Sequence, residues 1–340
     1  MADTTAPAER PFEDPSSEAL LRRLEWTVIR RLDGMLQGDH RTLMRGAGLD
    51  LADLREYQHH DDVRHIDWNV TARLQVPHVR QFTEDRELTV WFVLDLSASL
   101  DFGSVARRGT NAGAETVRTK RAVSTEFIGL MARLFTRHGN PVGALLYGDA
   151  VDAQLPPRTG RRHVLHLLQK LREHVAPQHG AETQLRDLLH AAHKRIRRRS
   201  MVFVVSDFIS APGWGPDMAV LAQRHEVLAV RLHDPAELDL PDVGLMTIQD
   251  AETGEQLFVD THDAGFRRRF VAAAEQREAD VLNDLTRAGV DTLEIATDDD
   301  LAETVLRYAD MRQQRRRLSS RGTLPAHLNP VSRAGAGAAA

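Results

Sequence analysis

The sequence lacks cysteine altogether. This absence excludes a disulfide framework and any thiolate metal site, and it suits the reducing conditions of the cytoplasm. Long apolar runs are missing as well, since no stretch approaches the roughly 20 apolar residues that a membrane-spanning helix needs. Residues 1–17 are polar and interrupted by proline, whereas a signal peptide has an apolar core. We therefore expect a cytoplasmic protein without a membrane span.

A strong excess of either charge is also missing. Lys and Arg total 44 against 49 for Asp and Glu, a formal net charge of −5, so the chain as a whole has no electrostatic attraction to nucleic acid. Two basic runs, 194–199 and 312–317, stand at the C-terminal ends of predicted helices, where the helix dipole favours cations. We expect no nucleic-acid partner.

What the sequence does contain is an alternation of short apolar runs with helical patterns. Residues 88–95, LTVWFVLD, form a nearly continuous apolar run that ends in an acid, typical of a strand buried on both faces of a parallel sheet. The alternation that follows predicts an α/β fold with a doubly wound, mainly parallel sheet. A glycine-containing turn between two alternating runs predicts an inserted β-hairpin at about 239–260. The predicted strands are 88–95, 142–147, 151–155, 201–205, 227–232 and 292–295, and the predicted helices are 120–138, 161–174, 184–198, 217–225, 266–288 and 300–312.

Changes in composition divide the chain into four parts. Residues 1–17 lack periodicity and predict a disordered tail, as do residues 313–340, which become rich in Ser, Gly, Pro and Ala. Residues 18–87 form an N-terminal helical and irregular extension, which begins with a helix predicted at 18–36. Residues 88–312 form the α/β domain.

Oxygen-bearing side chains follow the predicted strands or lie in loops beside them. Asp95, Ser97 and Ser99 come at the end of the strand 88–95, where the loops of an open α/β sheet converge on ligands. Mg²⁺ takes about six oxygen ligands and keeps several waters. Two carboxylates and three hydroxyls could therefore hold Mg²⁺, or Mn²⁺ or Ca²⁺ in its place, and leave one position open. The predicted ligands are Asp95, Ser97, Ser99, Thr183 and Asp207.

Each of these residues also has a purely structural explanation. Ser97 and Ser99 could cap the following turn, and Thr183 could be the N-cap of the helix predicted from Gln184. Asp207 could simply close its strand. The metal site is favoured because all of these residues are expected at one edge of the sheet.

The same residues resemble the metal-ion-dependent adhesion site of von Willebrand factor A domains. That site has the pattern D-x-S-x-S after the first strand, a Thr in a later loop and an Asp after the fourth strand, and the sequence matches it one for one over a resemblance that covers about 88–310. The resemblance implies that hydroxyls touch the metal directly, that the aspartates often act through water, and that a partner's carboxylate fills the open position.

The charged segment before the first strand resembles a second family. The runs at 53–57, 61–68, 71–73 and 79–82 are similar to the R-x-Y, G-D-D-x-R-x-I-D-W, T-A-R and v-R-x-F patterns of domain-of-unknown-function family 58. This resemblance takes in about residues 40–260. Members of that family resemble von Willebrand factor A proteins and are typically encoded beside MoxR-type AAA+ ATPases.

Two residues depart from the pattern of family 58. His60 stands where a Gly usually precedes the paired aspartates, and Leu100 replaces a Met after D-x-S-x-S. Neither is a predicted ligand. The alternation of Asp and Arg around Trp68 predicts a partly buried ion-pair network, which could be a brace on the α/β domain or a docking surface. We favour the brace.

The expected function is that of a Mg²⁺-dependent protein-interaction module, not an enzyme. The family 58 resemblance implies an adaptor or co-chaperone of a MoxR-type AAA+ ATPase in the assembly or remodelling of other proteins, with a client bound through a carboxylate. No G-x-S-x-G elbow or G-K-[ST] loop is present, and Ser97 replaces the second Asp of haloacid-dehalogenase-type enzymes. The alternative is a Mg²⁺-dependent hydrolase of phosphate esters that uses the same oxygens.

Overall fold

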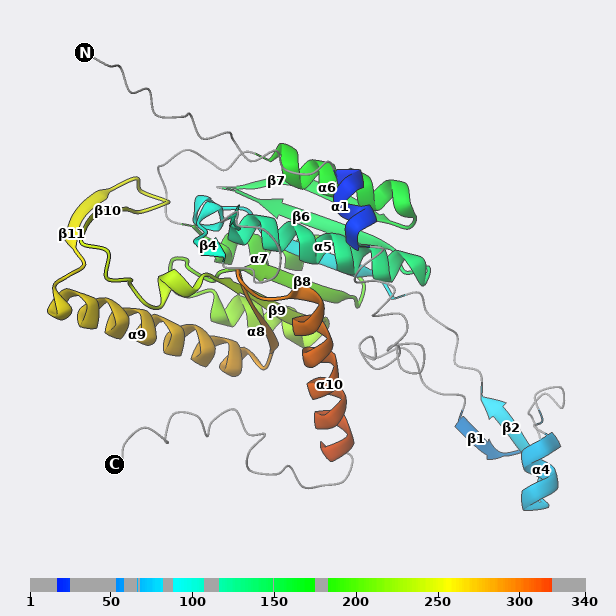
Figure 1. Ribbon diagram of the computed structural model, residues 1–340. Helices are drawn as coiled ribbons and strands as arrows, with labels where there is room; N and C mark the ends of the chain where they lie inside the picture. Colours follow the sequence, from blue (N-terminus) through cyan, green and yellow to red (C-terminus); the bar gives the residue numbers. More distant parts are fainter. Residues whose placement is uncertain are drawn as a thin grey trace, which may run out of the picture.

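The centre of the fold is a six-stranded sheet with the order β12-β9-β8-β3-β6-β7 (Figure 1). The computed structural model describes residues 17–24, 53–57, 66, 68–81, 88–106, 116–148, 150–174 and 183–319. Strands β3, β6, β8, β9 and β12 run parallel, and the edge strand β7 is antiparallel to β6. When the six strands are numbered 1 to 6 along the chain and read across the sheet from β7, their order is 3-2-1-4-5-6, which is typical of doubly wound sheets. The predicted fold class is confirmed.

The elements of this domain lie close to their predicted positions. The strands are β3 Val90–Asp95, β6 Val142–Tyr147, β7 Val151–Arg158, β8 Met201–Ser206, β9 Glu226–His233 and β12 Asp291–Ala296, with the hairpin strands β10 Leu245–Gln249 and β11 Gln256–Asp260 and the short pair β4 Val105–Ala106 and β5 Thr116–Val117. The helices are α5 Lys120–Arg137, α6 Arg161–Glu173, α7 Leu185–Arg195, α8 Gly215–Arg224, α9 Ala264–Ala288 and α10 Leu301–Ser319, with the 3-10 helices η3 Ala98–Asp101 and η4 Pro235–Glu237.

Three predicted ends were wrong by three or more residues. Helix α7 ends at Arg195, three residues before the end predicted at residue 198. Strand β7 continues through Pro156 and Pro157 to Arg158, although the sequence predicts its end at residue 155. Proline is tolerated there because β7 is an edge strand and has one free hydrogen-bonding side. Helix α10 runs to Ser319, beyond the end predicted at Arg312, because the Gln and Arg residues that follow favour helix and the next glycine comes only at residue 322.

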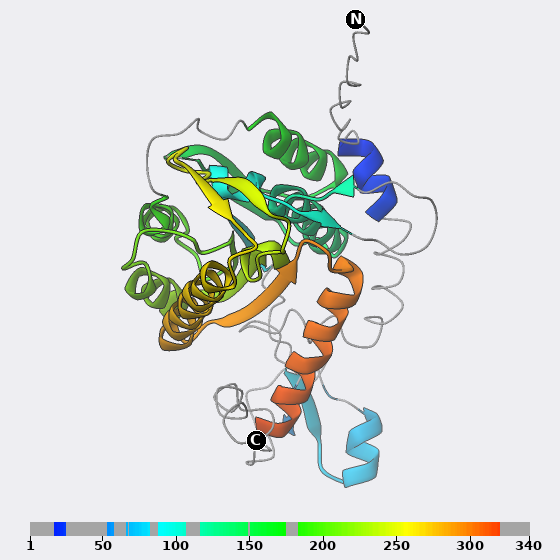
Figure 2. The same ribbon diagram turned by 60° about the vertical axis from the view of Figure 1, so that its left-hand side comes forward.

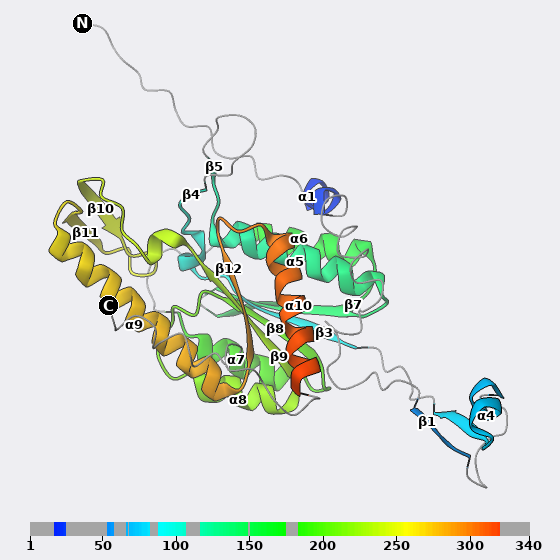
Figure 3. The same cartoon turned by 60° about the horizontal axis from the view of Figure 1, so that its bottom comes forward.

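Helices cover both faces of the sheet (Figures 1 and 3). Successive residues of a strand point to opposite faces. On β3, Phe92 and Leu94 join the buried cluster that includes α1, α5, α6 and α10, whereas Trp91 and Val93 join the cluster with α7, α8 and α9. A strand buried on both sides must be apolar throughout, which explains the run in residues 88–95.

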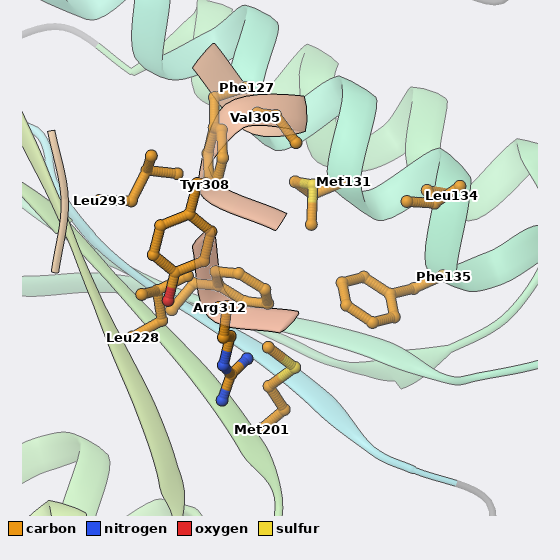
Figure 4. A pocket seen from close by; sticks show the side chains of 11 residues that line it. Phe127, Met131, Leu134, Phe135, Met201, Leu228, Leu293, Val305, Tyr308 and Arg312 are labelled. Carbon is orange, nitrogen blue, oxygen red and sulfur yellow. The ribbon is translucent and has the colours of Figure 1, made fainter. Parts of the chain in front are cut away.

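Aromatic side chains fill the core between the sheet and α5. The rings of Phe92 and Phe203 stack with centroids 5.2 Å apart, and Phe127 and Phe135 contact Phe203 edge-on. Next to them a small apolar cavity lies between α5, α10 and the sheet, with the ring of Tyr308 on one side (Figure 4). Its lining is apolar apart from the Tyr308 hydroxyl and Arg312, and it is too small to be a useful ligand site.

The N-terminal extension is described in part. Helix α1, Ser17–Leu24, buries three leucines against the cluster of α5 and α6. Strands β1 Asp53–Glu56 and β2 His78–Gln81 form an antiparallel pair, with helix α4 Trp68–Leu74 between them in the chain. Trp68, at the start of α4, is 70% exposed.

Several expectations fall on residues outside the described part. These are the tails 1–16 and 320–340, the continuation of the first helix over 25–36, and most of the predicted ion-pair network in 58–67. In the described part, none of the helices is long and apolar enough to cross a membrane.

Candidate metal centre

The two central strands β3 and β8 end side by side at the carboxyl edge of the sheet. Their register pairs Leu94 with Val205, so that Asp95 and Ser206 come next on each strand. From this edge the chain turns toward β6 on one side and toward β9 on the other, and such a divergence opens the crevice in which doubly wound sheets bind ligands. The Ser206 hydroxyl donates a hydrogen bond of 2.7 Å to Oδ2 of Asp95.

The first predicted segment folds back on itself directly after β3. The backbone N–H of Ser97 donates to Oδ1 of Asp95 over 3.0 Å, and the turn of η3 brings the Ser99 hydroxyl within 3.1 Å of the Ser97 hydroxyl. These side chains are buried, with at most 6% exposed. Ser97 precedes η3 but makes no capping hydrogen bond with its side chain, so the capping explanation does not hold for Ser97.

Asp207 is paired with a lysine that sequence reasoning missed. Its Oδ1 accepts from the backbone N–H of Ile209 over 3.0 Å, and its Oδ2 accepts from Lys120 Nζ over 2.7 Å. Lys120 is fully buried at the start of α5 and donates also to Glu237 over 2.6 Å. Burial lowers the pKa of Lys120, but the carboxylates of Asp207 and Glu237 outweigh this and raise it. Lys120 is therefore a buried cation.

A signal for Lys120 was present in the sequence. The first turn of a helix disfavours a cation because the helix dipole is positive there. A lysine at that position therefore needs a compensating partner, which the sequence alone does not identify.

Glu237 is held in place by a capping box. One of its oxygens accepts from the backbone N–H of Asp234 over 3.0 Å, and the other accepts from Lys120. Asp234 in turn accepts from the Thr297 hydroxyl over 2.6 Å and from the backbone of Ser104 over 2.8 Å. Burial raises the pKa of Asp234, but these hydrogen bonds outweigh it and the pKa is lowered. The D-x-x-E spacing was visible in the sequence as a helix-start signal.

The Asp95 carboxylate lies in an unfavourable environment for an anion. Burial, and then the charge of Asp207, raises the pKa of Asp95 to about 6, although hydrogen bonds from Ser206 and Ser97 act in the opposite direction. Both causes are relieved by a cation placed near the two carboxylates.

Thr183 lies in the loop before α7 and is 4% exposed. Its carbonyl accepts from the backbone of Ala211 over 3.0 Å and from the Ser210 hydroxyl over 2.8 Å. Its backbone N–H donates to Oε2 of Glu252 over 2.9 Å, and its hydroxyl donates to Oε1 of the same carboxylate. The N-cap of α7 is Gln184, so the capping explanation does not hold for Thr183.

The five predicted residues thus share one edge of the sheet but form two groups. Asp95, Ser97 and Ser99 are joined through Ser206 to the strand end that carries Asp207. Thr183 is tied to the loop after Asp207, and within the described residues no hydrogen bond links its side chain to the Asp95 group. No three acidic or histidine side chains of the described part gather closely enough to hold an ion by themselves, so hydroxyls would have to complete any donor set.

Comparison with family models identifies the chain. The model described as "Protein of unknown function DUF58" matches residues 53–280. The chain belongs to the DUF58 family. Relatives of this DUF58 protein include the uncharacterized proteins Mb1516 of Mycobacterium bovis and Rv1480 of Mycobacterium tuberculosis, each 37% identical over 316 residues, which cover 93% of this chain and 94% of the relative. The family predicted from residues 53–82 is confirmed.

Solved structures resemble the DUF58 protein only distantly. The conserved hypothetical protein BatB from Bacteroides thetaiotaomicron aligns with a TM-score of 0.41 and 12% identity, over 67% of this chain and 99% of that chain. The VWA domain of SpRpn10 aligns with a TM-score of 0.34 and 10% identity, over 65% of this chain and 95% of that chain.

Proposed function

We propose that this DUF58 protein is a Mg²⁺-dependent protein-interaction module. The hydroxyls of Ser97, Ser99 and Thr183 and the carboxylate of Asp95 would hold the ion. Asp207, whose two oxygens already accept from Lys120 and Ile209, would contribute mainly negative charge. When bound, Mg²⁺ supplies a positive centre that can take an oxygen ligand from another protein.

The observation that carries this proposal is the buried carboxylate of Asp95 beside Asp207. Burying an anion is costly unless it is paired with a cation. Asp95 has hydroxyl and backbone donors as neighbours. The cations described near it are bound to other groups, since Lys120 pairs with Asp207 and Glu237 and Arg121 pairs with Asp101 and donates to the carbonyls of Leu96 and Ser97. A divalent cation would supply the missing charge.

The carboxyl edge of the sheet has an excess of negative charge that a divalent cation would balance. The carboxylates of Asp95, Asp207 and Glu237 lie there, and Glu252 joins them through Thr183. Among the described residues, Lys120 contacts two of these carboxylates, and Arg121 pairs with Asp101. Oxygen ligands with excess negative charge are what Mg²⁺ requires. The donor set is therefore compatible with the ion in both chemistry and charge.

The partner in the proposal is a MoxR-type AAA+ ATPase, for which the chain would act as adaptor or co-chaperone. Support for this partner comes from family resemblance. The chemistry of the site adds one requirement, namely that the client or the ATPase presents a carboxylate to the ion. The binding should then depend on both the metal and the two serines.

The test is a binding measurement between the purified protein and a purified MoxR-type ATPase from the same source. Ser97→Ala/Ser99→Ala should weaken binding by at least about tenfold, and so should EDTA. Because EDTA also strips Mg²⁺ from the nucleotide of the ATPase, the serine variant is the decisive arm. Ser124→Ala is the matched control, since Ser124 is a buried serine of α5 outside the site. Equal binding by both variants would refute the proposed role of the metal.

A further inference from the structure

The tip of the β10–β11 hairpin is a turn held by hydrogen bonds. The strands pair in register from Leu245 with Asp260 to Gln249 with Gln256. In the turn between them, Oδ1 of Asp250 accepts from the backbone of Glu252 over 2.9 Å and from the backbone of Thr253 over 2.7 Å. Gly254 closes the turn with φ +72°, a conformation that favours glycine. These contacts fix the backbone of Glu252, and its carboxylate is held by Thr183.

The base of the hairpin is fixed as well. The Thr261 side chain is fully buried, donates to the carbonyl of Gly244 over 2.8 Å and accepts from the backbone of Val243 over 2.9 Å. Arg267 of α9 donates to the carbonyl of Thr261 and pairs with Asp242 over 2.9 Å. In the view of Figure 2 the hairpin stands in front of the sheet, and Figure 1 shows that it projects beyond the end of the sheet, beside the start of α9. Both of its ends are thus anchored, one at α9 and one at Thr183.

The contact at Thr183 joins an anion to a predicted metal ligand. Glu252 accepts from both the backbone N–H and the hydroxyl of Thr183, although the two residues are 69 positions apart in the chain. A hydroxyl that donates its proton to a carboxylate keeps its oxygen lone pairs free for a cation. Such an outer partner orients a ligand and increases its basicity.

We propose that the hairpin closes the metal site from within the chain, with Glu252 as the carboxylate at its open side. This inference rests on the proposed function. Glu252 positions the Thr183 hydroxyl for the ion and holds the place that an outside carboxylate would need. A partner therefore reaches the ion only after the hairpin tip has moved aside, and the exposed apolar residues Leu257 and Phe258 of the hairpin move with it.

The matched pair of variants for the test is Glu252→Gln and Glu255→Gln. Both remove one negative charge from the same turn, and Glu255 is exposed. The glutamine at position 252 keeps an oxygen that can accept from Thr183, so the fold should be retained, and thermal unfolding of the full chain checks this. Affinity is measured by calorimetric titration with Mg²⁺, and access to the ion by the water-proton relaxation of bound Mn²⁺, with acetate as the outside carboxylate.

If the inference is right, Glu252→Gln weakens Mg²⁺ binding by about tenfold, while Glu255→Gln binds as the wild type does. Bound Mn²⁺ in Glu252→Gln also relaxes water protons faster, and acetate suppresses this relaxation at lower concentration than in the wild type. If both variants bind Mg²⁺ as the wild type does and their bound Mn²⁺ relaxes water protons equally, Glu252 does not close the site. The proposed function would still stand. A folded wild type that binds no Mg²⁺ would overturn both.

Discussion

Replacing Lys120 by methionine should expose how strongly the site depends on its buried ammonium. Lys120 is fully buried and contacts Asp207 and Glu237 at 2.7 and 2.6 Å. The substitution keeps most of the apolar stem and removes the charge, which leaves two carboxylates without their cation. Removing one partner of a buried ion pair costs about 3–5 kcal/mol, and for a domain of this size we expect Tm to fall by roughly 10 °C.

Mg²⁺ should reverse part of this loss. A ligand that binds only the folded state stabilises it in proportion to the logarithm of its concentration over Kd. Without Lys120 the site is more negative, so it should bind Mg²⁺ more tightly, and the same millimolar addition should raise the stability of Lys120→Met more than that of the wild type. Urea unfolding with and without Mg²⁺ measures both quantities.

The control for this prediction is Lys170→Met. Lys170 pairs with Glu173 over 2.9 Å on the surface of α6, where loss of an exposed pair costs less than about 1 kcal/mol. If Lys120→Met is as stable as Lys170→Met in the absence of metal, the ammonium does not neutralise the buried carboxylates. If Mg²⁺ stabilises both variants equally, Lys120 and the ion do not share the same electrostatic site.

Three further outcomes are expected. Phe203→Ala removes a fully buried ring that stacks on Phe92 at 5.2 Å, and urea unfolding should show a loss of about 3–5 kcal/mol; a loss below about 1 kcal/mol would contradict the packing. Burial, and then the charge of Arg224, lowers the pKa of His225 to about 4. Because an unfolded histidine has a pKa of about 6.5, the unfolded state binds more protons between these two pH values. Stability should therefore fall as the pH drops from about 6.5 to 4, by up to about 3 kcal/mol more in the wild type than in His225→Gln, and parallel pH profiles would contradict this. Finally, phosphate esters should show no Mg²⁺-dependent turnover; a rate that Asp95→Asn abolishes would favour the hydrolase alternative.

The strands of the sheet could be predicted because the burial of each strand is visible in its own apolar residues. A strand with both faces covered must be apolar along its length, so Val90–Asp95 and Met201–Ser206 could be located without knowledge of their neighbours. Edge elements are less constrained, since β7 tolerates Pro156 and Pro157, which in a central strand would end it.

The site was predictable only where its residues are local. Asp95, Ser97 and Ser99 lie together because they occupy every second position at the end of one strand. Lys120 lies 87 residues from Asp207 and 117 from Glu237, and no pattern in the sequence encodes such pairings. For the same reason Glu252 could be placed in a hairpin turn but not against Thr183.

The measurement that most directly tests the site is an anomalous difference map from crystals grown with Mn²⁺. We predict a peak within about 2–2.5 Å of the hydroxyl oxygens of Ser97 and Ser99, with Thr183 on its far side and Lys120 still bound to Asp207. A map that shows well-ordered Ser97 and Ser99 hydroxyls bonded to each other, with no metal peak at the carboxyl edge of the sheet, would contradict it.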